Sequence, residues 1–438
     1  MYPKVKNSLA LKTILKRGII LIKSFTCRNF RNISVVELEF GRINILIGPN
    51  NAGKSNFIRA LSFCANMINN PSRETSGFLA EVQRNGMEGI VNRRDNSPQV
   101  DFSWRIALKN EEVKYSFSFN TGNTIEEFYI RNERVDGAKP SKGQDREFNF
   151  FNCHEGKRGE GIFSTTRHMG KKNSRKHIFV RDDETVLQQF NELVITNGNL
   201  LREKYVRNEM FTMLAEMREY FSKFYSYSSS RFDFDLIRQL RDPRSDGRVL
   251  EKDGANFANV YNRLLMTDED FSIRFIKRVR EIMPDVKAVN VVEGLEKIGI
   301  QIEKGDEVFM LAEMSDGTVE ALLLALLISL PKEISPTLLA IDEPEVNLHP
   351  AWQKSLARWL QMSDSFNQCF ISTHSSDFLD SFTEGFRNGM VDIFVYDGDG
   401  ENTFRKLDRS RVLPELEEGW LLGDLYRVND PAIGGWPW

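Results

Sequence analysis

The 438-residue sequence predicts an α/β protein with a mostly parallel central sheet, an N-terminal antiparallel β subdomain and a short helical insertion. Three observations support this fold class. Continuous apolar strands are followed by a loop and a helix at "INILIG", "TLLAID" and "QCFIST", as expected of parallel strands covered on both faces. Alternating apolar residues after Ile19 indicate half-buried strands. A stretch with helical periodicity lies between these two patterns.

Composition excludes several classes of protein. The longest apolar run, Ala321 to Leu330, is about half a membrane span, so we expect no membrane partner. Four widely spaced cysteines without a CxxC pair fit a reducing compartment and predict a cytoplasmic location. A formal charge of -3 gives no global attraction to nucleic acid, so any such contact needs a local basic patch.

The sequence divides into six segments. They are a basic leader (1–18), an N-terminal lobe with antiparallel strands (19–136), a basic glycine-rich insertion (137–182), a short helical arm or cap (183–253), a C-terminal lobe (254–390), and a β-hairpin with the tail (391–438). In the arm, apolar residues recur helically after a break at "TNGN", which predicts two antiparallel helices of about 40 Å. The stretch 157–181 holds eight Lys or Arg against one Glu. It is either a solvated loop or a contact for nucleic acid or an acidic partner.

The loop "GPNNAGKS" matches G-x-x-x-x-G-K-[ST] at every fixed position, between a predicted strand and a predicted helix. Backbone N–H groups of such a loop face the phosphates of ATP, and Lys54 is predicted to reach the β and γ oxygens. Ser55 is predicted to give a hydroxyl to Mg²⁺. The predicted nucleotide-binding residues of this loop are Gly48, Pro49, Asn50, Asn51, Ala52, Gly53, Lys54, Ser55 and Asn56.

A second motif, "LLAIDEPEVNLHP", brings two adjacent acids to the end of an apolar strand, where open α/β sheets bind ligands. Asp342 is predicted to hold Mg²⁺ through water, and Glu343 to orient or deprotonate the attacking water. Glu345 is a further candidate for Glu343's role. Next, "FISTHSSDF" ends another buried strand with His374, which is predicted to bind the γ-phosphate and to hold that water beside Glu343. The alternative is a structural histidine.

A short polar turn, "MSDGT", opens the apolar helix that follows it. Ser315 or Asp316 is an ordinary helix N-cap by its residue type. The N–H groups around Gly317 also make an anion site. Because the lysine loop already provides one phosphate cradle, the second is best used on a phosphate bound by another subunit.

Along the chain these four elements follow the order "GPNNAGKS", "MSDGT", "IDEPEVNLHP" and "STHS". In this order they resemble the ABC-type ATPase heads of the RecF, SMC and OLD group, and most closely the compact AAA-family ATPases of bacterial anti-phage defence and abortive-infection operons. The likeness covers most of the chain, from "FRNISVVELEFGRINILIGPNNAGKSN" through "EKDGANFANVYNRL" to "GWLLGDLYRVNDPAIGGWPW". It implies that two heads sandwich two ATP molecules, with Ser315 and Gly317 touching the γ-phosphate held by Lys54 of the opposite head. Residues 347–349 would lie at that dimer interface. ATP binding would close the dimer, and hydrolysis would reopen it.

The sequence also departs from parts of this group. "MSDGT" replaces the LSGGQ of transporters, and the arm is far shorter than in SMC proteins. Gln144 is only a candidate for the glutamine loop.

Two other patterns are discounted. "YDGDGEN" has the D-x-D form of a Toprim nuclease, but too few residues follow for that fold, and a hairpin turn is the better interpretation. Cys153, His154, His168 and His177 match no zinc-site spacing.

The leading hypothesis is an ATPase, with ATP and Mg²⁺ as cofactors, that forms a homodimer or higher homo-oligomer. It would act as sensor or scaffold for a separate effector, a nuclease or toxin, because the hydrolytic residues are present and no effector domain is recognisable. The alternative is a RecF-like DNA-binding ATPase of repair or replication, using the basic stretch 157–181. A third hypothesis is nucleotide binding as a structural switch without turnover.

Overall fold

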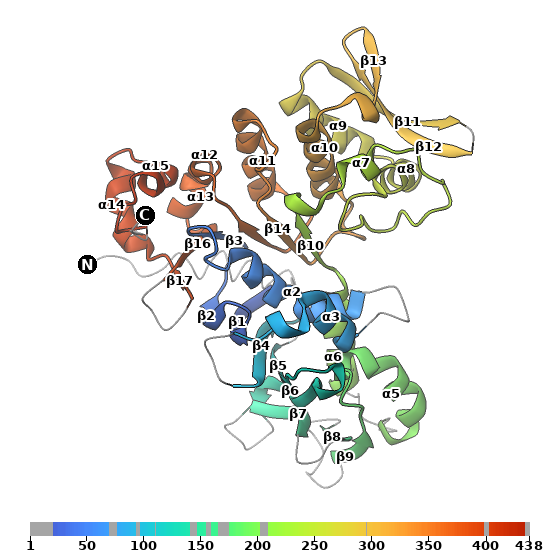
Figure 1. Ribbon diagram of the computed structural model, residues 1–438, viewed down its shortest axis with the longest axis vertical. Coiled ribbons are helices and arrows are strands. Elements are labelled where there is room, and N and C mark those ends of the chain that lie inside the picture. The colour runs from blue at the N-terminus through green and yellow to red at the C-terminus, as the bar shows by residue number, and fades with distance from the viewer. Residues whose placement is uncertain are drawn as a thin grey trace. The chain divides into compact units, whose positions relative to one another are not determined.

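The computed structural model describes residues 21–69, 77–92, 97–109, 111–140, 147–154, 159–164, 175–201, 209–294, 296–397 and 403–433. The leader 1–18 and Gln144 lie outside this part of the chain. The chain folds into two units, each assembled from three separate stretches of sequence. The first unit contains Met1–Arg42, Gly48–Phe224 and Phe394–Lys406, and the second contains Ile43–Ile47, Tyr225–Ile393 and Leu407–Trp438. Figure 1 labels the elements of both.

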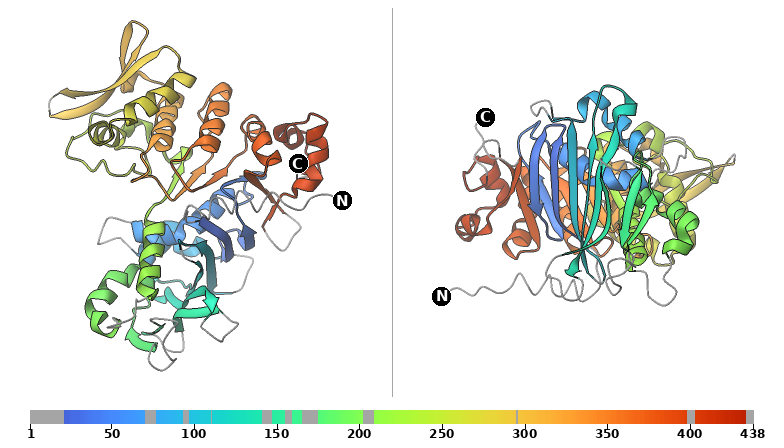
Figure 2. Two further views of the ribbon diagram at one scale, coloured as in Figure 1. Left: turned by 180° about the vertical axis from the view of Figure 1, so that it is seen from behind. Right: turned by 90° about the horizontal axis from the view of Figure 1, so that it is seen from below.

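The first unit is built on an eight-stranded antiparallel sheet with the order β2-β1-β4-β5-β6-β7-β8-β9. The right-hand view of Figure 2 shows these strands side by side. Its strands are β1 (Leu21–Phe30), β2 (Ile33–Glu39), β4 (Gln99–Ala107), β5 (Glu112–Asn120), β6 (Tyr129–Pro140), β7 (Glu147–His154), β8 (Glu160–Ser164) and β9 (Arg175–Phe179). The glycine-rich stretch thus supplies β7, β8 and β9, which extend the sheet in antiparallel register.

An aromatic core joins one face of this sheet to two helices, α2 (Lys54–Asn69) and α6 (Glu209–Ser222). Phe63 of α2 lies 5.1 Å from Phe102 of β4, measured between ring centroids. Trp104, also on β4, meets Phe221 of α6 edge-on at 5.8 Å. Large aromatic side chains bury much apolar area and favour such offset and edge-on contacts. The helix that carries Lys54 is therefore anchored on the sheet along its length.

The helical insertion of the first unit consists of two helices, as expected, α5 (Val186–Leu201) and α6. The break predicted at "TNGN" is wrong as the boundary between them, because α5 continues through residues 196–199 with a kink at Asn197. A smaller helix, α3 (Phe78–Asn85), and β17 (Phe404–Lys406) complete the unit. β17 pairs antiparallel with the end of β16 (Val391–Tyr396), as shown by the register of Tyr396 opposite Phe404.

The second unit contains a sheet with the order β10-β14-β15-β3, which continues to the beginning of β16. The strands are β3 (Ile43–Ile47), β10 (Phe224–Ser228), β14 (Leu338–Asp342) and β15 (Gln368–Ser372). β14, β15 and β3 run parallel, with Asp342 opposite Ser372 and Ser372 opposite Leu46. Almost every residue of these three strands is buried, which explains their unbroken apolar sequences.

The second unit also contains helices that precede, separate or follow its parallel strands along the chain. They include α7 (Phe234–Ile237), α8 (Phe257–Thr267), α9 (Phe271–Ile282), α10 (Asp316–Ser329), α11 (Pro350–Met362), α12 (Ser376–Asp380), α13 (Thr383–Arg387), α14 (Arg409–Glu417) and α15 (Leu422–Arg427). In α10 every residue from Thr318 to Ser329 is buried, so this helix is a core element and not an amphipathic surface helix. A second, antiparallel sheet of β11 (Val286–Gly294), β12 (Lys297–Lys304) and β13 (Glu307–Met310) precedes it.

The C-terminal helix α15 is fastened to α12. Arg427 donates to Asp377 at 2.6 Å and to Asp380 at 2.8 Å. The two helices approach so closely that a Cβ at Gly423 would lie 2.0 Å from the carbonyl oxygen of Ser376. Only glycine fits this position, and α15 is thereby joined to the helix that follows the predicted switch residue His374.

The predicted fold class is confirmed: a mostly parallel sheet, an antiparallel β subdomain and a short helical insertion are all present. Within the described residues, no helix combines the length and the apolar character that a bilayer crossing requires.

Candidate nucleotide-binding site

The lysine loop begins directly after β3 and ends at the first turn of α2. Gly48 and Gly53 have φ of 153° and 96°, and Asn51 has φ of 65°. A Cβ at Gly48 would lie 2.8 Å from Cβ of Tyr396, and one at Gly53 would lie 2.7 Å from Oδ1 of Asn32. The glycines at both ends of the motif are therefore required by backbone shape and by space.

Lys54 lies inside this loop and is 4% exposed. Its ammonium donates to the carbonyl oxygens of Gly48 at 2.9 Å and Pro49 at 3.1 Å. Asn32 braces the loop from the β1–β2 turn, since its amide donates to the carbonyl of Asn51 at 3.0 Å and its Oδ1 accepts from Asn56 at 2.9 Å. The charge of the lysine is thus held against two backbone carbonyl groups of the loop, next to the N-terminus of α2.

In the second unit, the acidic pair stands at the end of β14. Asp342 accepts a short hydrogen bond from the hydroxyl of Ser372 and a longer one, 3.4 Å, from Ser228. Glu343 has φ of 54°, a left-handed conformation that is unfavourable for a residue with a Cβ. Its N–H donates to the carbonyl of Ser372 at 3.1 Å, which turns the chain sharply where the strand ends.

This turn brings the side chain of Glu343 to His374. Nε2 of His374 lies 3.1 Å from Oε1 of Glu343, and both side chains are about one third exposed. The two residues come from the ends of neighbouring parallel strands, as predicted. A carboxylate and an imidazole in hydrogen-bond reach of each other, open to solvent, have the geometry needed to orient a water molecule.

Glu345 has a different environment from Glu343. It is 6% exposed, and its Oε1 accepts from Oγ1 of Thr373 at 2.5 Å, from N of His374 at 3.0 Å and from N of Ser375 at 3.3 Å. Burial raises the pKa of this carboxyl, and these donors oppose the shift. Glu345 therefore holds the backbone of residues 373–375, here called the switch loop.

The "MSDGT" turn, here called the signature turn (residues 314–318), opens α10. Ser315 is the N-cap, and its hydroxyl lies 3.4 Å from the N–H of Thr318 and 3.0 Å from its Oγ1. Arg238 fastens the turn by donating to the carbonyl of Met314 at 2.8 Å and to Asp316 at 2.5 Å. The ordinary capping role of Ser315 is thus observed.

The residues present fit ATP and Mg²⁺. A Cβ would fill the loop at either terminal glycine, and the lysine ammonium donates to carbonyl groups of its own loop. Carboxylate and hydroxyl oxygens are ligands that Mg²⁺ prefers. Ser55 in the first unit and Asp342 in the second each offer such a group. Among the described residues, no cluster of three or more His, Cys, Asp or Glu could hold a metal ion on its own.

Sequence reasoning missed several residues of this region. Ser228 and Ser372 orient Asp342, Arg238 fastens the signature turn, and Asn347 and Glu320 join α10 to the segment after β14. Ser228, Arg238 and Glu320 belong to no motif, although Glu320 is conspicuous as an acid within an apolar run. Ser372 and Asn347 lie within quoted motifs, but these contacts were not predicted for them. Of the discounted zinc candidates, His177 pairs with Glu160, and His168 lies outside the described residues, as do Lys171 and Lys172 of the basic stretch.

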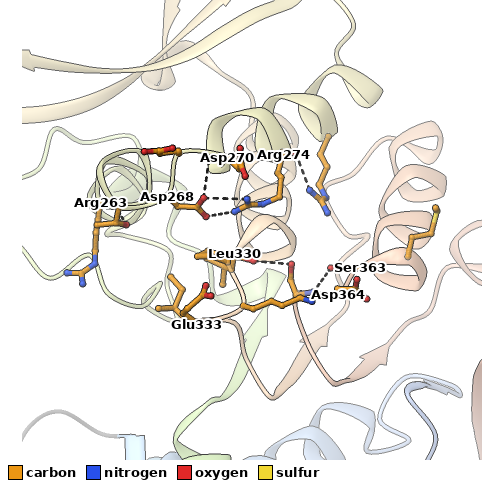
Figure 3. Close-up of a pocket in the computed structure, with 16 residues that line it drawn as sticks. Arg263, Asp268, Asp270, Arg274, Leu330, Glu333, Ser363 and Asp364 are labelled. Atoms are coloured by element: carbon orange, nitrogen blue, oxygen red, sulfur yellow. Dashed lines mark hydrogen bonds and ion pairs between the residues drawn. The ribbon is translucent and has the colours of Figure 1, made fainter. Parts of the chain in front are cut away.

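A pocket of about 900 Å³ in the second unit lies elsewhere (Figure 3). The segments that precede β14 and β15, including Leu330 and Ser363, line this pocket. The pocket therefore lies near the amino ends of these strands, whereas Asp342 and His374 lie at or after their carboxyl ends. Its Arg274 is already paired with Asp268. No predicted site residue lines it, and parallel sheets bind ligands at the opposite edge.

The fold and the ordered motifs define a P-loop ATPase domain of the ABC type. The chain belongs to the family described as "AAA domain, putative AbiEii toxin, Type IV TA system", whose profile matches residues 43–380. This confirms the family resemblance found in the sequence. A comparison with curated proteins found no match.

Solved structures with similarity to this chain include SMC head domains. The Pyrococcus furiosus Smc head with an extended coiled coil, bound to the C-terminal domain of ScpA, is 13% identical with a TM-score of 0.48, over 91% of this chain and 99% of that chain. The SMC head domain from Thermotoga maritima is 13% identical with a TM-score of 0.40, over 88% and 97% of the two chains.

Proposed function

We propose that this protein binds and hydrolyses ATP, and that the turnover is slow and regulatory. The observation that carries the proposal is the arrangement at the ends of β14 and β15, where Glu343 and His374 lie 3.1 Å apart beside Asp342. The carboxylate of Glu343 directly follows that of Asp342, the proposed metal ligand, and two neighbouring negative charges repel each other. A role of Glu343 in hydrolysis explains why a second acid stands there despite this cost.

Each residue has a defined task in this proposal. The lysine loop binds the phosphates through its backbone N–H groups, and Lys54 neutralises charge on the β and γ oxygens. Ser55 and Asp342 hold Mg²⁺, which supplies charge neutralisation at the transferring phosphoryl group. Glu343 takes up the proton of the attacking water, and His374 keeps that water and the γ-phosphate in register. Glu345 contributes by holding the switch loop.

We further propose that two copies close around ATP. Ser315 and Gly317 of one copy would contact the γ-phosphate held by Lys54 of the other, because a helix N-terminus attracts anions. ATP binding then favours the closed dimer, and hydrolysis releases it. The family description names a toxin of a toxin–antitoxin system. This supports a role in anti-phage defence. We propose that the closed and open states control a separate effector protein, a nuclease or toxin.

The test uses the full chain, with phosphate release and mass in solution measured with and without ATP and Mg²⁺. Wild type is expected to release phosphate and to dimerise transiently. Glu343→Gln should lose release and keep a stable ATP-bound dimer, whereas Lys54→Ala should lose ATP binding and the dimer. Glu303→Gln, on β12, is the matched control and should behave as wild type. Phosphate release by Glu343→Gln at the wild-type rate would contradict the role of Glu343.

A further inference from the structure

Glu320 is a buried acid that the proposed reaction does not use. It is 0% exposed, and all the remaining residues of α10 from Val319 to Ile328 are apolar. Its Oε2 accepts from Nδ2 of Asn347 at 2.7 Å. Its Oε1 is buried without a hydrogen bond of ordinary geometry in the described part of the chain. Burying a carboxylate in this way costs free energy, so the contact of Glu320 with Asn347 requires an explanation.

Asn347 also touches α10 through its backbone. A Cβ at Gly317 would lie 2.4 Å from the carbonyl oxygen of Asn347, so this approach is possible only with glycine in the signature turn. Gly317 and Glu320 are three residues apart and share one face of the helix. The segment from Glu343 to His349, here called the post-strand segment, is therefore joined to α10 at two points, one through the backbone and one through a side chain.

This double contact connects two parts of the candidate site. The post-strand segment begins at Glu343, which faces His374, and α10 begins at the signature turn. The groups that act on the Glu320 carboxylate are Asn347 and Glu345 of the post-strand segment, Asp316 of its own helix, and Ser229 after β10. Burial raises the pKa of Glu320 to about 7, while the side chains of Ser229 and Asn347 oppose this shift.

We propose that Glu320 is a positioning residue: by fixing Asn347, its carboxylate holds the post-strand segment against the signature turn and so sets Glu343 relative to Ser315 and Gly317. The proposal rests on the proposed ATPase function. Glu320 acts through Asn347 and touches no nucleotide. Since the charged carboxylate accepts a stronger hydrogen bond than the neutral acid, the link is tightest when Glu320 is ionised.

The experiment compares Glu320→Leu, Glu320→Gln and Asn347→Ala in the full chain. Glu320→Leu and Asn347→Ala are expected to lower kcat for ATP by roughly tenfold, the loss of about one hydrogen bond to a charged group, with KM changed less than about twofold. Glu320→Gln keeps an acceptor for Asn347 and should retain most of kcat. Glu320→Leu should not lower the melting temperature, because it removes a buried carboxylate.

Two further measurements separate positioning from general damage. Wild-type kcat should fall as the pH decreases through about 7, and this part of the profile should be flat in Glu320→Gln. The matched control is Glu303→Leu, which removes a similar pair, Asn290 to Glu303 at 2.8 Å, from the β11–β12 sheet and should leave kcat unchanged.

Three outcomes would overturn the inference: equal kcat in Glu320→Leu and wild type, an equal loss in Glu303→Leu, or a lower melting temperature in Glu320→Leu with no recovery of kcat in Glu320→Gln. Absence of ATP hydrolysis by the wild-type protein is distinguishable from these, and it would overturn the proposed function together with this inference.

Discussion

Replacing Glu345 by alanine is expected to destabilise the second unit and to slow ATP turnover. The structure gives three donors to Oε1 of this residue, from Thr373, His374 and Ser375. Ser375 keeps another acceptor, since its N–H also lies 2.9 Å from Oγ1 of Thr373, so two donors lose their partner. Each such bond to a carboxylate contributes about 1.5–3 kcal/mol.

Relief of the buried carboxylate offsets part of this loss, so the expected cost of Glu345→Ala is roughly 2–4 kcal/mol of unfolding free energy. Glu345→Gln keeps the acceptor oxygen and should cost less than about 1 kcal/mol. The assay is denaturant unfolding of both variants beside wild type, followed by phosphate release under native conditions. Our proposal gives Glu345 the task of positioning the switch loop and Glu343 that of the base, so Glu345→Gln should retain most turnover, unlike Glu343→Gln.

The reasoning would be refuted by either of two results. Equal unfolding free energies for Glu345→Ala and Glu345→Gln would show that the acceptor oxygen does not stabilise the switch loop. Complete loss of hydrolysis in a stably folded Glu345→Gln would show that the carboxylate takes part in the chemical step itself.

Three other substitutions test separate parts of the structure. Gly53→Ala is expected to lose binding of a fluorescent ATP analogue, because the backbone φ at this position is 96° and the added Cβ would lie 2.7 Å from Asn32. Unchanged affinity of the variant for the analogue would refute the loop geometry. Gly423→Ala should speed amide hydrogen exchange in α15, because its Cβ would lie 2.0 Å from the carbonyl of Ser376; unchanged protection would argue against the close approach. Glu133 is buried and accepts from Tyr115 at 2.7 Å, and burial raises its pKa to about 8. The unfolded chain therefore loses this proton near pH 4.5 and the folded chain only near 8, so the unfolding free energy should fall over this interval by about 1.4 kcal/mol per pH unit. Glu133→Gln should flatten that slope, and an equally steep slope in the variant would exclude Glu133 as its cause.

Sequence reasoning predicted the parts of this protein that follow local rules. Unbroken apolar runs identified β3, β14 and β15, and the polar residues at their ends identified the edge at which Asp342, Glu343 and His374 meet. These predictions succeed because both the burial of a strand and the spacing of a motif can be inferred from residues that are close together in the sequence.

Other features depend on contacts between residues far apart in the sequence. Nothing in "MSDGT" shows that Gly317 meets the carbonyl of Asn347, thirty residues later. Ser228 lies 114 positions from Asp342, to which it donates. The glycine-rich stretch extends the antiparallel sheet through β7, β8 and β9. Its composition does not predict strands, and these strands are stabilised by hydrogen bonds to their neighbours in the sheet.

The placement of β3 has a consequence for synthesis of the chain. Asn44 of β3 donates to the carbonyl of Cys369 in β15, a partner 325 residues later. At about 5–20 residues per second, a ribosome needs roughly 15 s to 1 min to make the intervening chain. During that time the apolar segment "INILI" has left the ribosome without its neighbouring strand. We therefore expect chaperone demand during translation to depend on this segment. A circular permutant that begins between β2 and β3 should leave the delay unchanged, because β3 is still made 325 residues before its partner in β15.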